Sequence, residues 1–205
     1  MTDYHTPLLP GEKYHILGRA VGSEKLFRQD KNYSFFLLRY QKYIRPIADT
    51  FSYCLLPNHF HFLIRPKSSK ILLPYFRQLK NEDYSVDMLP TLIMRQFSNL
   101  LNSYTKSFNE MYKRKGGLFI DYMRRVPIKS DRQFSSTVFY IHKNPVHHGY
   151  CKKMEDWKWS SYSTMLSDKR TSLLRPEVLN SFGGLKGFLD YHSQPIYLKE
   201  MPDFR

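Results

Sequence analysis

The chain has 205 residues, which is enough for one domain with a real core or for a core domain plus an appendage. Lys and Arg number 32 against 18 Asp and Glu, and the net charge of +14 points to a polyanionic partner, with nucleic acid as the leading candidate and a merely basic protein as the alternative. Two cysteines are too few for a disulfide scaffold, and no signal sequence or bilayer-spanning run is present, so we expect a reduced, cytoplasmic protein without a membrane partner.

The first part of the chain predicts a β-α-β-β order. Residues 1–12 contain Pro7, Pro10 and Gly11 and are expected to form an irregular arm. Apolar spacing then predicts a strand over residues 13–21, a helix over 30–47 that Pro46 closes or kinks, and a strand over 50–56. A turn at Pro57-Asn58 leads into a further strand. We therefore expect an antiparallel sheet with helices packed against it.

The second part predicts further helices around one more strand. We expect a connector over 67–90 with a short helix near 72–79, a long helix over 93–111, a strand over 118–126, and a helix from Asp131 that Ser130 caps and Pro145 ends. The connector is interpreted as a plain surface insertion, with a lid or a DNA-contact loop as alternatives. Residues 163–205 are predicted to be a helical or irregular appendage, with short helices between 173 and 188 and a loose final ten residues.

The stretch at residues 55–64 reads Leu-Leu-Pro-Asn-His-Phe-His-Phe-Leu-Ile. Successive side chains of a strand point to opposite faces, so His59 and His61 share one face and Phe60 and Phe62 share the other. Two imidazoles at this spacing form half of a site for a divalent metal ion. The alternative is a pair of polar residues on the open face of a half-buried strand.

A tyrosine in the helix from Asp131 supplies a second candidate. Its apolar stripe is formed by Phe134, Val138 and Ile141, whereas Tyr140 lies off that stripe. Asn144 follows one turn later on the side of Tyr140, although Pro145 biases it away from helical geometry. A tyrosine beside an amide ligand suits a nucleophile next to a metal. With 16 tyrosines in the chain, an ordinary core or surface aromatic is the alternative.

The two stretches together resemble the REP-associated tyrosine transposases, of the insertion sequence 200-like, single-tyrosine branch of the HUH (His-hydrophobic-His) nucleases. The resemblance runs from Tyr14 to about Tyr162 and includes Gly117-Leu118-Phe119 and Trp159-Ser160-Ser161-Tyr162. It implies a ferredoxin-like (HUH-type) α+β fold in a catalytic domain over residues 13–162, with 67–90 as an insertion. A departure is His142-Lys143, where relatives often carry Glu-Leu.

The same resemblance implies roles for the candidate residues. His59 and His61 would be metal ligands, Asn144 would complete the metal shell, and Tyr140 would be the nucleophile. The implied metal is Mg²⁺ or Mn²⁺, although imidazole ligands also suit Zn²⁺. His15 could approach this site, but we expect it to pack in the core.

The implied activity is that of a transposase. It would act as a metal-dependent endonuclease and strand transferase that cleaves single-stranded DNA at or near a palindromic hairpin through a 5′-phosphotyrosine intermediate. Related transposases act as dimers while REP-associated members can act alone, so both a monomer and a homodimer remain open. The alternatives are a catalytically inactive hairpin-binding protein of the same fold and a hydrolase that uses water instead of tyrosine.

Basic residues near the two motifs are expected to contact DNA phosphates, and each contact would add salt-dependent affinity. The alternative for such a cluster is a solvated helix end. The predicted contacts are Lys113, Arg114, Lys115, Arg124, Arg125 and Lys143.

Overall fold

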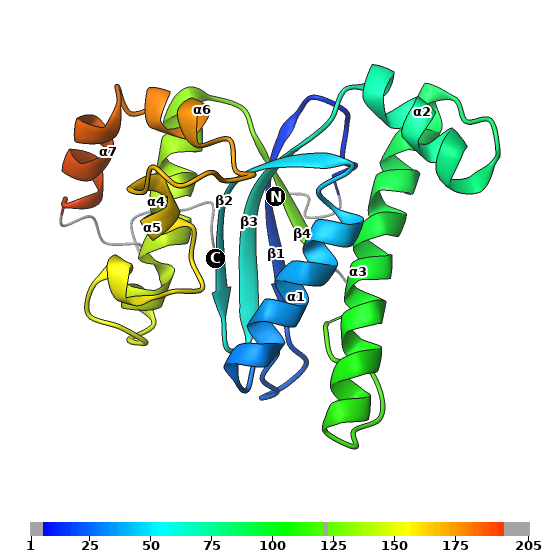
Figure 1. The fold of residues 1–205 in the computed structure, drawn as a ribbon, viewed down its shortest axis with the longest axis horizontal. Coiled ribbons are helices and arrows are strands. Elements are labelled where there is room, and N and C mark those ends of the chain that lie inside the picture. Colours follow the sequence, from blue (N-terminus) through cyan, green and yellow to red (C-terminus); the bar gives the residue numbers. More distant parts are fainter. Residues whose placement is uncertain (1–5, 121–122, 195–205) are drawn as a thin grey trace.

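The computed structural model describes residues 6–120 and 123–194. Its centre is a four-stranded sheet in the order β2-β3-β1-β4, in which every pairing is antiparallel (Figure 1). The strands are β1 (Lys13–Arg19), β2 (Ala48–Leu56), β3 (His59–Pro66) and β4 (Arg124–Ile128). The expected α+β class with an antiparallel sheet and packed helices is confirmed. The final ten residues, expected to be loose, lie outside the described ranges.

Helices cover both faces of the sheet (Figure 1). α1 (Asp30–Tyr43) and α3 (Leu89–Met111) lie against one face, and α4 (Asp131–His147) lies against the other. The shorter elements are α2 (Ser69–Lys80), the 3-10 turns η1 (Val86–Met88) and η2 (Met154–Asp156), α5 (Tyr162–Met165), α6 (Arg175–Asn180) and α7 (Leu185–His192). Within the described ranges, no helix combines the length and the apolar character needed to cross a membrane.

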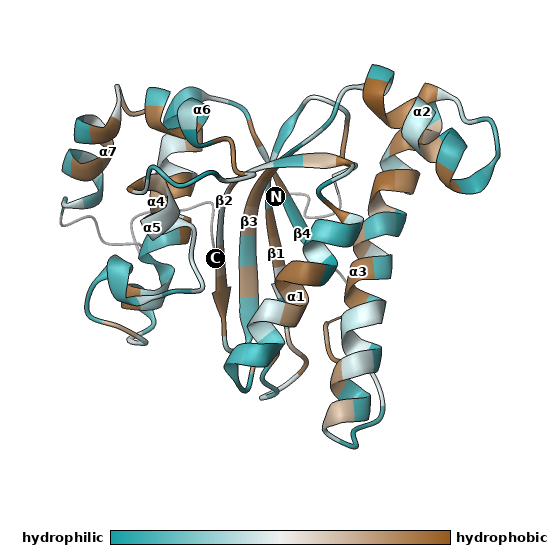
Figure 2. Ribbon diagram, viewed as in Figure 1, coloured by the Kyte–Doolittle hydropathy of each residue, from teal (hydrophilic) through white to brown (hydrophobic). Residues whose placement is uncertain are grey.

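The alternation of side chains along the strands divides the buried residues into two cores, one on each face of the sheet. Phe60 and Phe62 of β3 join the first core with α1 and α3, whereas Leu63 joins the second core with α4. Figure 2 shows the apolar residues concentrated in the strands and along α3. β3 therefore carries Phe60 and Phe62 on the face of the first core, and its two histidines share the other face with Leu63.

Several element boundaries differ by two to four residues from those expected, and three differences concern prolines or the site. α4 continues through Pro145 to His147, because Pro145 lies in the last turn, where its missing N–H removes a single helical bond, and because its ring is buried. α1 ends at Tyr43, ahead of Pro46. The strand expected over 118–126 begins at Arg124, while Phe119 forms only an isolated bridge. Residues 121 and 122, within that expected strand, are outside the described part of the chain.

The outer edge of β2 is covered by the segment that follows α4. Leu55 N donates to Trp159 O, Ser161 N donates to Tyr53 O, and Leu174 N donates to Thr50 O, each at 2.9 Å. An uncovered edge would present a row of unpaired backbone groups to other chains. The segment over 159–174 therefore completes the sheet as well as linking α4 to α6.

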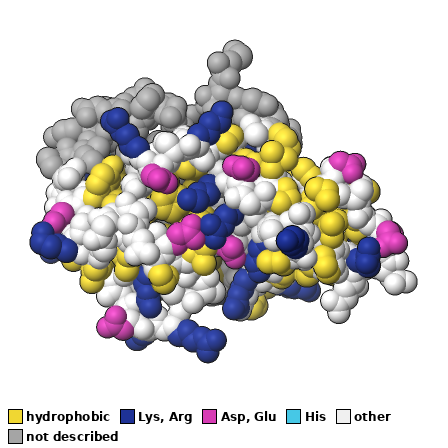
Figure 3. Space-filling model, turned by 90° about the horizontal axis from the view of Figure 1, so that it is seen from above, with side chains coloured by type: hydrophobic (Ala, Val, Ile, Leu, Met, Phe, Trp, Pro, Cys, Tyr) yellow, Lys and Arg dark blue, Asp and Glu magenta, His cyan; other side chains and the backbone are white. Residues whose placement is uncertain are grey.

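Charged side chains meet at the end of the sheet where β2 begins and β3 ends. Arg65 on β3 donates both terminal nitrogens to the Glu177 carboxylate of α6, at 2.9 and 3.1 Å, and lies 3.6 Å from Asp49 of β2. Seen from above, basic side chains near the middle of this face lie beside acidic ones (Figure 3). Arg65 is therefore paired within the protein and not open to an external anion.

Gly18 allows β1 and β3 to pair closely. It lies opposite Phe60, and a Cβ at this position would come 2.2 Å from the Phe60 ring. The ring has little room to move, because it packs on Phe36 at a centroid distance of 5.1 Å and its exposed fraction is 1%.

We expect Gly18→Ala to lower the free energy of unfolding by about 1–3 kcal/mol through overpacking. Gly117→Ala is the matched control, because a Cβ there meets nothing closer than 3.9 Å. Urea denaturation of both variants measures the difference. Equal midpoints would contradict this account of Gly18.

Candidate active site

His59 and His61 lie on the face of β3 that α4 covers. The β1–β3 register pairs His61 with Leu17 and His59 with Arg19, so these four side chains share one face of the sheet. The exposed fractions of His59 and His61 are 8% and 1%, and their ring centroids are 5.0 Å apart. The expected pairing of two imidazoles on one face is confirmed, and that face is buried, not open.

α4 brings Tyr140 to these imidazoles. The helix begins at the expected cap, where Ser130 Oγ accepts from Gln133 N at 3.2 Å, and its apolar stripe packs on the sheet. The Tyr140 ring meets His61 edge-on, with a centroid distance of 5.4 Å. Tyr140, His59 and His61 line one cavity of about 240 Å³. Residues from two distant parts of the sequence therefore converge.

Two buried polar atoms beside Tyr140 have no hydrogen-bond partner among the described residues. Asn144 Nδ2 donates to Tyr140 O at 2.9 Å, which leaves Asn144 Oδ1 unpaired. His61 Nε2 is also unpaired, while its Nδ1 lies 3.0 Å from His15 Nε2. Leaving a buried polar atom unpaired costs about 1–3 kcal/mol. These two atoms are therefore suited to a ligand.

The neighbouring contacts orient the imidazoles as metal donors. Asn58 Oδ1 only accepts, so His59 Nδ1, 2.7 Å away, carries the proton and Nε2 keeps its lone pair. His61 presents the same lone pair when Nδ1 donates to His15. Among the described residues, no three His, Cys, Asp or Glu side chains are grouped to hold a metal. The available donors are two imidazoles and an amide oxygen, a set that fits a divalent ion with open positions.

Burial keeps these imidazoles neutral, which is the form that binds metal. It lowers the pKa of His15 to about 3 and, with smaller effects of His148 and Arg19, the pKa of His59 to about 3. It also holds the pKa of His61 well below 6.5. Burial raises the pKa of Tyr140, which a hydrogen bond from Asn144 partly offsets. The phenol is therefore protonated at neutral pH and a poor nucleophile until it is activated.

Comparisons with known proteins support the resemblance. No protein-family model matches the chain. A Haemophilus influenzae protein assigned as a REP-associated tyrosine transposase is 27% identical over 116 residues, which cover 56% of this chain and 58% of that protein. The chain thus aligns with less than two thirds of the length of this relative. A solved structure of a REP-associated tyrosine transposase bound to a REP hairpin shares the fold, with a TM-score of 0.59, 16% identity, and coverage of 82% of this chain and 87% of the other. The resemblance to REP-associated tyrosine transposases is confirmed.

The two arginines of β4 lie on opposite faces of the sheet. Arg124 lines the cavity with Tyr140. Arg125 points to the other face, where its Nε donates to Thr6 O at 3.0 Å and its exposed fraction is 8%. Arg124 therefore faces the cavity of Tyr140 and Arg125 faces the opposite core, and their expected contacts with DNA stay a prediction.

The other basic residues expected to contact DNA are dispersed. Arg114 pairs with Glu24 at 2.6 Å. Lys113 and Lys115 are exposed just after α3, and Lys143 lines a separate hollow against the C-terminal segment. Their expected role in phosphate binding stays a prediction.

Several residues of the cavity region were not expected there. Arg19 and His148 line the cavity, and His15 both packs in the core, as expected, and contacts His61. His15 and Arg19 are an even number of residues apart, so a strand places them on one face. Asn144 and His148 follow Tyr140 at intervals of four, so a helix places all three on one side. The second signal was hidden because Pro145 was expected to end the helix.

His142, which departs from the pattern of the REP-associated relatives, belongs to a buried hydrogen-bond chain. Its Nδ1 lies 3.0 Å from His192 Nε2 of α7, and its Nε2 lies 2.8 Å from Ser161 Oγ. His192 Nδ1 lies 2.8 Å from Phe188 O, which only accepts. All atoms are satisfied when Ser161 donates to His142, His142 to His192, and His192 to Phe188. This series of hydrogen bonds links α4, which carries Tyr140, to α7.

The buried histidines predict acid sensitivity of the fold. In the unfolded chain they titrate near 6.5, whereas burial lowers the pKa of His15 and His59 to about 3 and that of His192 to about 4. The unfolded state therefore binds more protons between these values, and stability falls as pH falls from 6.5 toward 4. Each such group contributes about 1.4 kcal/mol per pH unit in this window.

We expect denaturant titrations of the metal-free protein to give a lower free energy of unfolding at pH 5 than at pH 7. His192→Phe should reduce the slope of stability against pH by about one proton, or about 1.4 kcal/mol per pH unit. A slope that is the same in the wild type and in His192→Phe would be inconsistent with this assignment.

Proposed function

We propose that the chain is a metal-dependent transposase that nicks and rejoins single-stranded DNA at or near a hairpin, with Tyr140 as the nucleophile. The observation that carries this proposal is that Tyr140 shares one cavity with His59 and His61 although they come from different elements. The hairpin is inferred from the solved relative, which is bound to a REP hairpin.

Two arginines support a phosphodiester as the substrate of this cavity. Arg19 and Arg124 line it, from β1 and from the start of β4. Guanidinium groups bind phosphate oxygens with two parallel hydrogen bonds, so they suit a DNA backbone better than a neutral substrate. The net charge of +14 favours the approach of the same polyanion.

The chemistry assigned to the chain is an in-line displacement at phosphorus. When bound, a Mg²⁺ or Mn²⁺ ion would polarise the scissile phosphate as a Lewis acid. His59, His61 and Asn144 would hold that ion, and Arg19 and Arg124 would orient the phosphate oxygens. Tyr140 Oη forms the new bond to phosphorus while the bond to O3′ breaks. The phenolic proton passes to water or to the neutral His148, and the leaving O3′ takes up a proton.

The product of this step explains how one site could both cut and join. The 5′ end of the DNA remains on Tyr140 as a phosphotyrosine, and the other end is a free 3′-hydroxyl. Attack of a 3′-hydroxyl on the phosphotyrosine reverses the reaction, so the energy of the bond is conserved. No nucleotide cofactor is needed for rejoining.

Tyr140→Phe tests the nucleophile. We expect this variant to lose the denaturant-resistant adduct with a hairpin oligonucleotide in Mn²⁺, while it binds the same oligonucleotide as tightly as the wild type, because only the attacking oxygen is removed. Gel electrophoresis under denaturing conditions measures the adduct, and fluorescence anisotropy measures binding. Cleavage that persists in Tyr140→Phe would favour a water-dependent hydrolase. Binding without any adduct in the wild type would favour an inactive hairpin-binding protein.

His15→Leu tests the support of His61. Loss of the hydrogen bond to Nδ1 removes what orients the imidazole, so we expect the Mn²⁺ concentration for half-maximal adduct formation to rise by about 10–100-fold. Saturating Mn²⁺ should restore most of the yield, because His15 does not hold the ion. Tyr14→Phe, on the opposite face of β1, is the control. An unchanged Mn²⁺ dependence in His15→Leu would refute this role.

A further inference from the structure

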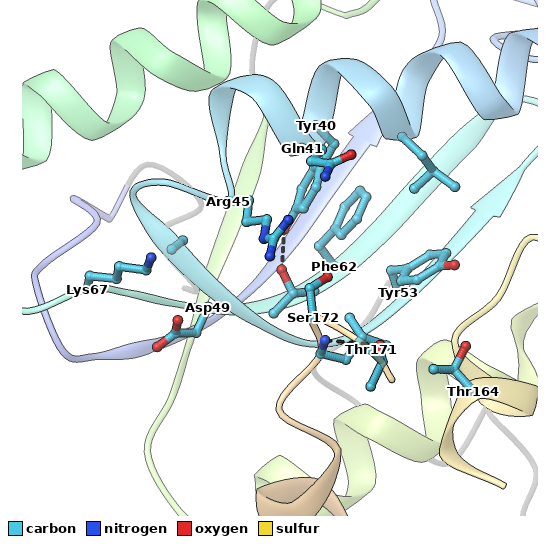
Figure 4. A pocket seen from close by; sticks show the side chains of 14 residues that line it. Tyr40, Gln41, Arg45, Asp49, Tyr53, Phe62, Lys67, Thr164, Thr171 and Ser172 are labelled. Atoms are coloured by element: carbon cyan, nitrogen blue, oxygen red, sulfur yellow. Dashed lines mark hydrogen bonds between the residues drawn. The ribbon is translucent and has the colours of Figure 1, made fainter. Parts of the chain in front are cut away.

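A second cavity, of about 360 Å³, lies between α1, β2 and the C-terminal segment (Figure 4). Phe62 lines it from β3, and Tyr53 lies opposite Phe62 on β2. Phe62 follows His61 along the strand and therefore points to the other face of the sheet. The second cavity is thus on the opposite side of the sheet from Tyr140.

We propose that this second cavity binds one unpaired nucleotide of the DNA strand, with its base against the aromatic side chains and its phosphate on Arg45 and Lys67. The proposal rests on the proposed function only in taking DNA as the ligand. It assigns a recognition site that is separate from the residues that cleave.

The aromatic part of the cavity has a fixed geometry. The Tyr40 and Phe62 rings stack with a centroid distance of 4.2 Å and an interplanar angle of 8°, and the Tyr40 hydroxyl is 2.8 Å from Thr50 Oγ1. The ring centroid of Tyr53 lies 5.8 Å from that of Phe62, and Tyr53 is only half-buried. Tyr53 therefore offers an aromatic surface on which a base of any identity can stack.

Two cations at this cavity are available to a phosphate. Arg45 is exposed and Lys67 is half-buried, and neither side chain forms an ion pair with any described residue. The acidic residue of the cavity, Asp49, lies 3.6 Å from Arg65. Figure 4 shows Lys67 and Asp49 at one end of the cavity, Tyr53 toward the other, and Arg45 and Phe62 between them. A phosphate and a base could therefore be held at different ends.

The C-terminal wall of the cavity is held in place by Arg175. Its guanidinium donates to the carbonyls of Thr164 at 3.2 Å and Lys169 at 3.0 Å, and also to that of Ser167. Leu174 N is bound to Thr50 O, so both ends of the loop are fixed. Hydroxyls of Thr164, Thr171 and Ser172 line this wall. They supply donors and acceptors for the edge of a base.

The size and chemistry of the cavity favour one nucleotide over larger or simpler ligands. A volume of about 360 Å³ is at the lower end of the range for small-molecule sites. An apolar ligand would leave Arg45 and Lys67 unused, and a bare anion would leave the aromatic end empty. A base joined to a phosphate uses both ends, and only an unpaired base can enter.

The test compares binding of two DNA hairpins in the Tyr140→Phe background, which keeps the strand intact. One hairpin carries a single-stranded flank of about six nucleotides, within the footprint of known single-strand sites, and the other is blunt. The variant is Arg45→Gln with Lys67→Gln. Its matched control is Lys31→Gln with Lys42→Gln, which makes the same charge change at exposed residues of α1 outside the cavity.

We expect the Arg45/Lys67 variant to lose roughly tenfold in affinity for the flanked hairpin and almost nothing for the blunt one. Its salt dependence should fall by about 0.7 in log–log slope for each phosphate of the single strand that the variant no longer neutralises. A 5-iodo-2′-deoxyuridine in the flank should crosslink to a peptide containing Tyr53 or residues 164–173. Equal losses on both hairpins, or losses no larger than those of the control, would overturn the proposal.

Three further outcomes separate this proposal from others. Release of the flank by free deoxyadenosine monophosphate, with no such release in the Arg45/Lys67 variant, would support the nucleotide site, because the flank and the free nucleotide would then compete for it. A wild-type protein that forms no adduct, yet shows flank binding that depends on Arg45 and Lys67, would refute nicking and support the pocket. If the wild type forms the adduct and the Arg45/Lys67 variant binds the flank as tightly as the wild type, nicking would be supported and the pocket refuted.

Discussion

The cavity that Tyr140, His59 and His61 line depends on one constraint, the burial of uncharged imidazoles between β3 and α4. His61 is fully enclosed, so it must remain neutral, and a neutral imidazole needs one donor partner and one acceptor partner. His15 satisfies Nδ1, and within the described residues nothing satisfies Nε2. The fold thus retains an unpaired nitrogen and an unpaired Asn144 oxygen that apolar side chains could have replaced. Retaining two such atoms beside a buried phenol is expected of a site that binds an ion and not of a core optimised for stability.

The position of α4 relative to that imidazole pair is fixed from the opposite side of the helix. His142 lies two residues after Tyr140, and its hydrogen bonds reach α7 and the segment that covers β2. Ser161 also accepts from Tyr53 N at 2.9 Å, so the same hydroxyl joins α4 to the edge strand. A rotation of α4 that moved the phenol would break this buried chain. The network therefore gives His142 a structural role in the placement of α4.

Local periodicity predicted the parts of the fold that local rules control. A period of two predicted the shared face of His59 and His61, and an i, i+4 spacing predicted the shared side of Tyr140 and Asn144. Their convergence could not be predicted from periodicity, because residues 59 and 140 are brought together only by packing, and the resemblance alone implied it. The face of the sheet to which Arg124 or Arg125 points depends on the pairing of β4 with β1, which the composition of the strand does not reveal. One of the two partners of His142 is His192 in α7, beyond the region of resemblance, so no sequence signal pointed to that contact.

The C-terminal segment contributes to both cavities, although they lie on opposite faces of the sheet. His192 of α7 holds the helix that carries Tyr140, and residues 164–173 form a wall of the second cavity. The two effects pass through the same contacts with β2, because Ser161 and Leu174 bind the strand on either side of that loop. The C-terminal segment therefore fixes both the position of α4 and one wall of the second cavity through the same edge strand, so a change in its contacts with β2 would reach both cavities.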